Sequence, residues 1–296
     1  MGKFRILLSQ TFITCFGKRT RLISDERFNK ILFRLRTGKK ANLDAPKTFN
    51  ENVLARKVRN DEYALADYTD KYEVRKYVAE KIGPEYVVPA LGVWDSLEDI
   101  DFSALPQSFV LKATHGSGWN VIVKDKSTLR IEQDCKALKK SLSYNYYHKS
   151  REKNYKNIKP RILCEKYVET ANAKGLVDFK VYCFYGKAGF FEITYTENDK
   201  QHQALYYPDF TPVGMENAHA QPDTSGYISI YKDKIIGLAE TLSAEFEFVR
   251  ADFYIADENI YFSELTFHSG GGIRPICPHE VDVAMGSFFE RKTLVK

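Results

Sequence analysis

The sequence contains no apolar run long enough to cross a membrane, and it contains little cysteine. Its longest uninterrupted apolar stretches, such as residues 87–91, have the length of a strand, whereas a membrane helix needs roughly 20 apolar residues. The five cysteines are widely separated and include no Cys-x-x-Cys pair, which predicts free thiols in a reducing compartment rather than disulfide bonds or a zinc site. Ser9 breaks the apolar run after Arg5, and no small-residue cleavage site follows. We therefore expect a cytoplasmic protein without a signal peptide.

Motifs of several enzyme classes are missing as well. The sequence has no G-x-S-x-G, H-E-x-x-H or Cys–His pattern, which argues against a hydrolase with a protein nucleophile. It also has no Walker A loop and no G-x-G-x-x-G opening a helix, the fingerprints of P-loop and Rossmann nucleotide sites. No nucleic-acid-binding motif is present, so we expect no nucleic-acid partner.

The composition that is present is typical of a globular protein, but its charge is uneven. The 296 residues are 44 % hydrophobic and 28 % charged, and the length corresponds to about two domains. Residues 1–60 hold 15 Lys/Arg and 4 Asp/Glu, whereas the remainder holds 29 Lys/Arg and 35 Asp/Glu. Such a basic N-terminal region can contact an anionic polysaccharide or the anionic inner face of a membrane. A solvated helical face is an equally good interpretation.

The hydrophobic periodicity predicts helices and strands in alternation. Period-3.6 patterns predict helices at residues 25–40, from Thr48, at 70–82, 131–143 and 231–246. Thr48 and Glu51 have the spacing of a capping box. Strands are predicted at 87–93, 108–112, 119–124 and 161–168, with hairpins over 177–196 and 248–266. The expected fold class is α+β with antiparallel sheets.

The last predicted hairpin carries the sharpest chemical feature. If residues 257–259 form its turn, Asp252 lies directly opposite Glu264, and Arg250 lies opposite Thr266 on the same face. Two carboxylates about 5 Å apart repel each other unless a cation lies between them or one is protonated. Such a pair suits Mg²⁺, and an arginine beside it could bind a phosphate. A two-residue turn is the alternative, because it would shift the register and separate the acids onto opposite faces.

A second feature is the lysine Lys112, which ends the strand 108–112 and precedes the glycine-rich loop 114–118. Glycines let backbone N–H groups approach phosphates, and lysine adds a point charge. The loop alone is equally compatible with an ordinary glycine turn beside an exposed lysine, which is the more common outcome.

Three further segments combine charge with a strand or a loop. The strand end 164–169 could pair with the rim of a purine, or it could be a core strand with solvated Glu and Lys. Asp178 and Lys180 share one strand face, as functional groups or as a surface ion pair. The loop 268–274 contains three successive glycines, so it could wrap an anion with Arg274 as a carboxylate clamp, or it could be a flexible loop.

Taken in order, these segments resemble the ATP-grasp superfamily, and more closely the TupA-like ATP-grasp family, named for teichuronopeptide synthesis. The matching stretches span residues 28 to 280 and are Thr48-Phe49-Asn50-Glu51, Asp70-Lys71-Tyr72, Leu91-Gly92-Val93-Trp94, 109–120, 178–180 and 261–272. The resemblance implies two α+β lobes that hold ATP between them, with Mg²⁺ as the metal. It implies an ATP-dependent ligase that joins a carboxylate to an amine through an acyl phosphate.

The resemblance also implies roles for individual residues. ATP would contact Lys71, Lys112, His115, Gly116, Ser117, Gly118, Glu165, Lys166, Tyr167, Val168 and Asp178. Asp252 and Glu264 would hold Mg²⁺ together with Thr266, which replaces the asparagine usual in the wider superfamily. Arg250 and Lys180 would neutralise phosphoryl charge, and Arg274 would line the acceptor site.

We therefore predict a basic helical region at 1–60, a preceding segment at 61–105, one ATP-grasp lobe at 106–175 and a second at 176–296. The predicted reaction attaches an amino acid or another amine to a carboxylate, such as a uronic acid of a bacterial capsular or surface polysaccharide. The alternatives are a glycosyltransferase acting on capsule precursors and a non-catalytic nucleotide-binding protein. A glycosyltransferase often has a D-x-D motif, and here only Asp99-Ile100-Asp101 has that form.

Overall fold

The computed structural model describes residues 2–16, 22–59, 61–169, 176–197, 200–207, 209–213, 225–256 and 258–293. The helices are α1 (Gly2–Phe16), α2 (Asp25–Thr37), α3 (Phe49–Lys57), α4 (Ala66–Thr69), α5 (Val74–Ile82), α6 (Ile131–Asp134), α7 (Lys136–Ser141), α8 (Tyr147–Ser150), α9 (Ser225–Ser243) and α10 (His279–Gly286). The strands are β1 (Ala90–Trp94), β2 (Phe109–Ala113), β3 (Asn120–Val123), β4 (Ile162–Lys166), β5 (Val177–Phe184), β6 (Lys187–Glu197), β7 (Lys200–Tyr206), β8 (Phe248–Ala256) and β9 (Asn259–Thr266). Short 3₁₀ segments lie between them, and the one used below is η6 (Ser269–Gly272).

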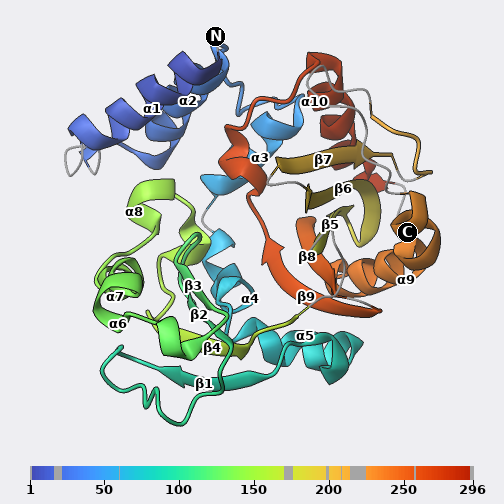
Figure 1. The fold of residues 1–296 in the computed structure, drawn as a ribbon. Helices are drawn as coiled ribbons and strands as arrows, with labels where there is room; N and C mark the ends of the chain where they lie inside the picture. The colour runs from blue at the N-terminus through green and yellow to red at the C-terminus, as the bar shows by residue number, and fades with distance from the viewer. Residues whose placement is uncertain are drawn as a thin grey trace.

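The smaller sheet is antiparallel and has the order β1-β4-β2-β3 (Figure 1). Side chains alternate along β2: Phe109, Leu111 and Ala113 are buried, whereas Lys112 is half-buried on the other face. The buried face packs against Leu138 of α7 and its neighbours. The sheet therefore presents Lys112 on the face that is not covered by this core.

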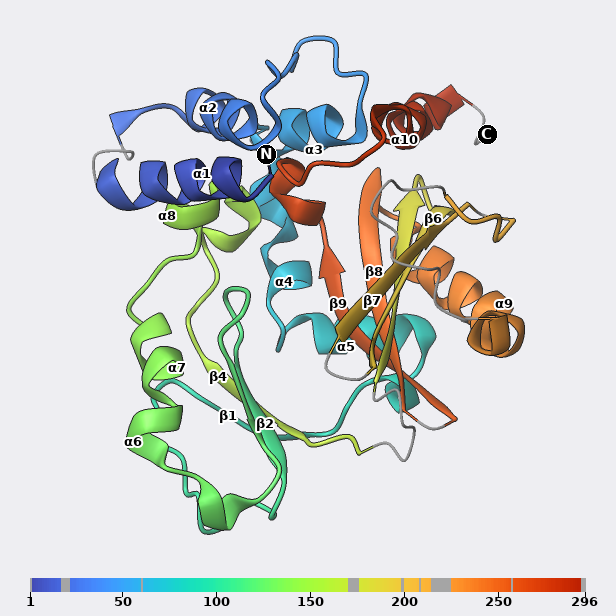
Figure 2. The same ribbon diagram turned by 45° about the horizontal axis from the view of Figure 1, so that its top comes forward.

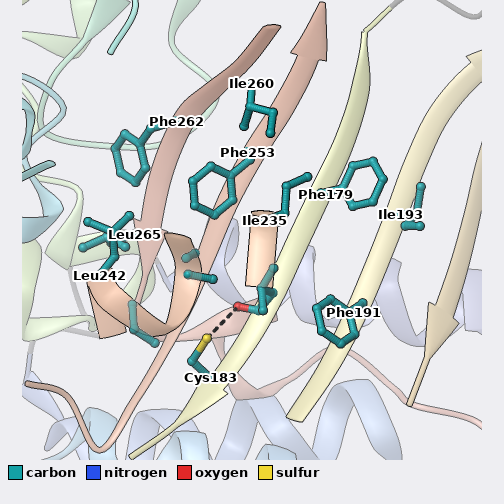
Figure 3. Close-up of a cluster of buried hydrophobic side chains, with 14 of the residues drawn as sticks. Phe179, Cys183, Phe191, Ile193, Ile235, Leu242, Phe253, Ile260, Phe262 and Leu265 are labelled. Atoms are coloured by element: carbon teal, nitrogen blue, oxygen red, sulfur yellow. Dashed lines mark hydrogen bonds between the residues drawn. The ribbon is translucent and has the colours of Figure 1, made fainter. Parts of the chain in front are cut away.

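The larger sheet has the order β7-β6-β5-β8-β9 and is also antiparallel. One face forms the main core, in which Phe179 and Phe253 pack against Ile235 and Leu242 of α9 (Figure 3). The strands alternate with period two, so Lys180 and its partner Asp252 lie on the opposite face. One end of this face packs against α3 and α10 in a second core around Phe49 and Met285. Polar groups gather on the remainder of the face.

The N-terminal region is helical, as predicted. In α2, Ser24 caps the first turn and Gly38 ends the helix in a left-handed conformation. The capping box predicted at Thr48 is present, because Thr48 accepts from the N–H of Glu51 and the Glu51 carboxylate accepts from the N–H of Thr48. Figure 2 shows α1 and α2 beside α3, with α10 at the other end of α3.

Several predicted boundaries differ from the structure. The helix predicted at 70–82 begins only at Val74, the one at 131–143 is interrupted at Cys135, and α9 begins at Ser225. Strand β7 is not among the predicted strands. Residues 60 and 175, where two domain boundaries are predicted, lie outside the described ranges. No helix in the described part of the chain combines the length and apolarity needed to span a bilayer.

The β8–β9 hairpin brings the two predicted acids together by a route that differs from the prediction. Ala256 pairs with Asn259, so two residues, rather than three, separate the strands. Tyr254 therefore faces Tyr261, and Phe253 faces Phe262. A bulge then leaves Ser263 without a partner, and Asp252 pairs with Glu264 after all. The two-residue turn and the facing acids coexist because the bulge restores the register.

Candidate active site

A cavity of about 310 Å³ lies between the polar faces of the two sheets. It is lined by Lys71, Lys112, Ala113, Gly116, Ser117, Gly118, Trp119, Asn120, Asp178, Lys180, Arg250, Asp252, Ser263 and Glu264. The lining thus combines ten of the predicted site residues, drawn from both lobes. Its volume is at the lower end of the range for ligand sites, which is about 300–1,000 Å³.

The carboxylate pair on the large sheet is held by one arginine. Arg250 donates from Nε to Asp252 Oδ1 at 2.7 Å and from Nη2 to Oδ2 at 2.5 Å. Its Nη2 also lies 3.7 Å from Glu264 Oε1 and donates to Thr266 Oγ1 at 3.2 Å. The guanidinium therefore bridges the predicted metal ligands and acts as the local cation.

The electrostatics of this pair favour the binding of a cation. Burial raises the pKa of Asp252 to about 7, and the nearby charge of Glu264 acts in the same direction, against the opposing effect of Arg250. For Glu264, burial alone would raise the pKa, but Lys71 and Arg250 together lower it below its usual value. A divalent ion bound beside a buried carboxylate with a raised pKa would stabilise its charged form.

The residues present fit Mg²⁺. The carboxylates of Asp252 and Glu264 offer oxygen ligands to one end of the cavity. Thr266, the third predicted ligand, does not line the cavity, and its hydroxyl donates to Glu264 Oε1 at 2.9 Å. Mg²⁺ is commonly held by one or two carboxylates together with substrate phosphates. In the described part of the chain, no three His, Cys, Asp or Glu side chains form a metal-binding group.

Lysines approach the cavity from three directions. Lys71 donates to the carbonyl of Gly116 at 2.9 Å and lies 3.7 Å from Glu264. Lys180 donates to Thr194 Oγ1 at 2.6 Å and to Glu192 Oε1 at 3.5 Å. Lys112 reaches in from β2 of the other lobe. A polyanion in the cavity would be surrounded by positive charge.

The glycine-rich loop follows β2 and forms one wall of the cavity. Gly116, Ser117 and Gly118 line it. His115 does not, because its ring is 2 % exposed, its Nε2 lies 2.9 Å from the carbonyl of Ser141, and its ring centroid is 5.4 Å from that of Trp119. Burial lowers the pKa of His115 below its usual value. The structure therefore places His115 as an anchor of the loop in the small lobe, away from the cavity surface.

Glu165 lies behind the cavity wall, next to Lys112. Its carboxylate is buried and accepts from Lys112 Nζ at 2.6 Å and from Arg75 Nη1 at 2.6 Å. In this arrangement Glu165 positions Lys112, and it does not line the cavity. Lys166 ends β4, and Tyr167 and Val168 follow it. None of the three lines the cavity either.

Asp178 lies in the cavity lining on β5, opposite Thr194 on β6 and Tyr254 on β8. Burial raises the pKa of Asp178, whereas Lys180 and Arg250 lower it, and the net effect is an increase. Asp178 and Lys180 therefore share one face with the acid pair, as the period-two pattern predicts.

The predicted acceptor loop forms the turn η6 beyond the acids. Gly270, Gly271 and Gly272 all have positive φ, and a Cβ at Gly272 would come within 3.0 Å of the backbone oxygen of Asn50. Ser269 accepts from Arg250 Nη1 at 3.0 Å. Arg274 donates to Gln203 at 2.7 Å and lies 3.7 Å from Glu192 Oε2. The loop thus adjoins the acid pair at one end and carries Arg274 at the other.

A buried charged cluster supports this loop from behind. His268 is 3 % exposed, and its Nε2 lies 3.1 Å from Glu62 and its Nδ1 3.7 Å from Glu152. Burial lowers the pKa of His268, but Glu152 and Glu62 raise it more, so the result is above the ordinary value. Lys57, also buried, donates to the carbonyl of Gly271 at 3.1 Å.

Two charged residues near the site, Arg75 and Glu192, were not predicted. Arg75 belongs to α5, and the helical pattern of that segment places it on the exposed face. Its contact with Glu165 depends on how α5 packs against β4. Glu192 is buried and accepts from Tyr182 at 2.8 Å. The available signal for Glu192 was a charged residue in the middle of an apolar strand, which is unusual in a core.

The fold is similar to that of several solved ligases. These include an L-amino acid ligase from Bacillus licheniformis (13 % identity, TM-score 0.46, covering 77 % of this chain and 50 % of that one). They also include a D-alanine–D-alanine ligase from Bacillus anthracis complexed with ATP (15 % identity, TM-score 0.43, covering 70 % and 57 %). A third is the N5-carboxyaminoimidazole ribonucleotide synthetase from Thermus thermophilus (11 % identity, TM-score 0.38, covering 69 % and 46 %). The chain thus spans about half the length of these structures.

No curated relative matches the chain in sequence. A model of the family described as TupA-like ATPgrasp matches residues 51–290. This match covers most of the chain and confirms the predicted ATP-grasp fold with two antiparallel sheets. The chain therefore belongs to the TupA-like ATP-grasp family of ATP-grasp enzymes.

Proposed function

We propose that this protein is an ATP-dependent ligase that joins a carboxylate to an amine. A carboxylate oxygen of the substrate attacks the γ-phosphorus of ATP, and ADP leaves. The amine nitrogen then attacks the acyl carbon, phosphate leaves, and the nitrogen releases a proton. The observation that carries the proposal is the cavity itself, in which Lys71, Lys112 and Lys180 surround a carboxylate pair held by Arg250.

The lining residues suit phosphoryl transfer because that reaction depends mainly on positioning and on neutralising charge. The lysines would offset the repulsion between the substrate carboxylate and the phosphates, and Arg250 is within reach of a group bound next to Asp252. Bound at Asp252 and Glu264, Mg²⁺ would supply Lewis-acid polarisation of phosphate oxygens. The glycine-rich loop would limit the access of water to the reacting groups. None of the lining residues is a His or a Cys, and the proposed reaction needs no protein nucleophile.

The proposed acceptor is a uronic acid of a bacterial surface polysaccharide, joined to an amino acid or another amine. Arg274 supports a carboxylate acceptor, because its side chain is 50 % exposed beside the glycine loop. The uneven charge of the chain, with its basic N-terminal region, supports an anionic partner.

Two other functions are less well supported. A glycosyltransferase would need its D-x-D carboxylates at a nucleotide site, but Asp99 accepts from Ser96 and Asp101 accepts from Ser103, and neither lines the cavity. A non-catalytic nucleotide-binding protein would not need Lys112, Asp252 and Glu264 in one cavity.

The test is to incubate the protein with ATP, Mg²⁺, pooled uronic acids and pooled amino acids. Mass spectrometry should detect an amide product, and ADP release should depend on the added carboxylate. ADP release that never responds to any carboxylate would contradict the proposal, and consumption of a nucleotide sugar without ATP would favour the glycosyltransferase.

A further inference from the structure

A continuous basic track runs over the N-terminal helices, outside the active-site cavity. Its first part is a hollow along α2, lined by Arg27, Lys30, Arg34 and Lys40 among others. Its second part is a larger hollow of about 700 Å³ between α1, α2, the segment 39–48 and α10. Lys40 lines both hollows, so they meet at that residue.

The track has more basic than acidic side chains in its linings. The larger hollow is lined by Arg5, Arg36, Lys39, Lys40 and Lys47, and none of them has an ion-pair partner within the described ranges. Along α2, Glu26 bonds to Lys30 at 2.5 Å, but no acid pairs with Arg27 or Arg34 in the part of the chain that the structure covers.

The two acids that line the larger hollow are already engaged. Glu51 accepts from the backbone N–H groups of Asn42, Lys47 and Thr48 at 3.0–3.1 Å. Asp282 accepts from the backbone N–H and the side-chain amide of Asn50, at 3.0 and 3.1 Å. Both carboxylates hold structure in place and keep their charge. Five Arg and Lys side chains line the hollow against these two acids, so a surplus of positive charge remains for a ligand.

The track is physically linked to the acceptor side of the active site. Pro275, Ile276 and Cys277, which directly follow Arg274, line the larger hollow. Asn50 joins the two regions, because its side-chain amide donates both to the carbonyl of Arg274 at 3.0 Å and to Asp282. A ligand in the hollow would therefore lie beside the segment that carries Arg274.

The shape and chemistry of the track favour an extended acidic carbohydrate. A bilayer would contact a convex surface, whereas the track is concave. Single-stranded nucleic acid binds on exposed aromatic side chains, and the one aromatic residue in either lining, Phe33, is 3 % exposed. Clusters of arginine also recognise acidic peptides, so an acidic peptide is the competitor that the test includes. The glycan is favoured because the larger hollow adjoins residues 275–277, which directly follow Arg274.

We infer that this track binds the polyanionic chain of the acceptor, a glycan with a carboxylate on successive sugar units, and delivers its end to Arg274. The inference rests on the proposed function for the identity of the acceptor. The binding itself needs neither ATP nor turnover, and it is measured separately from the reaction.

The test uses the full chain without ATP and a fluorescently labelled oligogalacturonate of about ten units. The variant Lys39→Gln/Lys40→Gln removes two exposed charges of the track. The control Lys76→Gln/Lys159→Gln removes two exposed charges elsewhere, so both proteins have the same net charge. Fluorescence anisotropy at low ionic strength, where screening lengths exceed about 10 Å, gives the affinities.

We expect the oligomer to bind the wild type at least about tenfold more tightly than the galacturonate monomer does. We expect the track variant to lose at least about tenfold in affinity for the oligomer. Each basic side chain near an anionic surface contributes roughly fivefold in affinity, and the variant removes two. The control variant should stay within about twofold of the wild type.

Equal losses in both variants would overturn the inference, because they would show an unspecific effect of net charge. The inference would also be overturned if the protein bound another polyanion more tightly than the oligogalacturonate. The polyanions to compare are anionic phospholipid vesicles, a single-stranded oligonucleotide and an oligoglutamate of the same charge. The vesicle arm is needed because Ile6, Leu7 and Leu8 of α1 are exposed. Track-dependent oligomer binding without any carboxylate-dependent ADP release would support the binding site and contradict the proposed function.

Discussion

Removing one charge from the Asp252–Glu264 pair should abolish turnover while the fold survives. At a separation of about 5 Å and an effective dielectric constant of about 20, two carboxylates repel by about 3 kcal/mol. Solvent lowers this figure, because the Glu264 side chain is 35 % exposed. Arg250 attracts Asp252 with a comparable energy of opposite sign. Asp252→Asn or Glu264→Gln loses an attraction to Arg250 and relieves the repulsion between the two carboxylates. The free energy of unfolding should therefore change by less than about 2 kcal/mol.

Activity should respond far more strongly than stability. Each variant removes one of two carboxylates that would hold Mg²⁺, and losing one preorganised charge interaction in a site costs about 100-fold or more in kcat. The assays are carboxylate-dependent ADP release over a range of Mg²⁺ concentrations, and urea unfolding of the same preparations. Asp233→Asn, on the exposed side of α9, is the matched control. If both site variants kept kcat within threefold of the wild type and the same Mg²⁺ dependence, the assignment of these acids to the metal would be refuted.

Three further predictions concern the surroundings of the site. Glu165→Gln removes the carboxylate that holds Lys112 and Arg75, so KM for ATP should rise about tenfold or more with little change in KM for the carboxylate; an unchanged KM for ATP would count against a positioning role. His268 has a raised pKa in the folded protein, so the stability that its charge contributes is complete below about pH 6.5 and is lost as the pH rises through the folded-state value. The stability difference between wild type and His268→Gln, from urea unfolding, should therefore shrink from pH 6 to pH 9, and a growing difference would contradict this sign. Gly272→Ala adds a Cβ at a φ of 66° against the Asn50 carbonyl, and it should cost about 1–2 kcal/mol of unfolding free energy; Gly237→Ala, in open space on α9, is the control.

The local patterns of the sequence predicted much of the fold and part of the site. The capping box at Thr48 and the α+β class follow from short-range spacing. The facing of Asp252 and Glu264 was predicted through a three-residue turn, whereas the structure reaches it through a shorter turn and a bulge. Period-two alternation predicted that Asp178 and Lys180 share one face, and the structure adds that Lys180 is paired with Asp252. These features depend on residues close together in sequence, or on a single hairpin, where backbone geometry leaves few choices.

Features that depend on distant contacts could not be predicted in this way. His115 lies in the glycine loop, but its ring turns to the carbonyl of Ser141 in another element. Glu165 lies at a strand end, but its carboxylate meets Arg75 from α5, which is 90 positions away in sequence. No periodicity indicates which partner a buried charge will find, because that choice depends on how the helices and sheets pack.

The bulge at Ser263 has a consequence for how this hairpin tolerates changes in length. A two-residue turn with one extra strand residue sets the same acid pairing as a three-residue turn with a regular strand. Deleting Ser263 would restore strict inside–outside alternation from Ile260 to Thr266 and would leave the two acids opposite each other. A residue can therefore move between the turn and the strand of this hairpin without changing the pairing of Asp252 with Glu264.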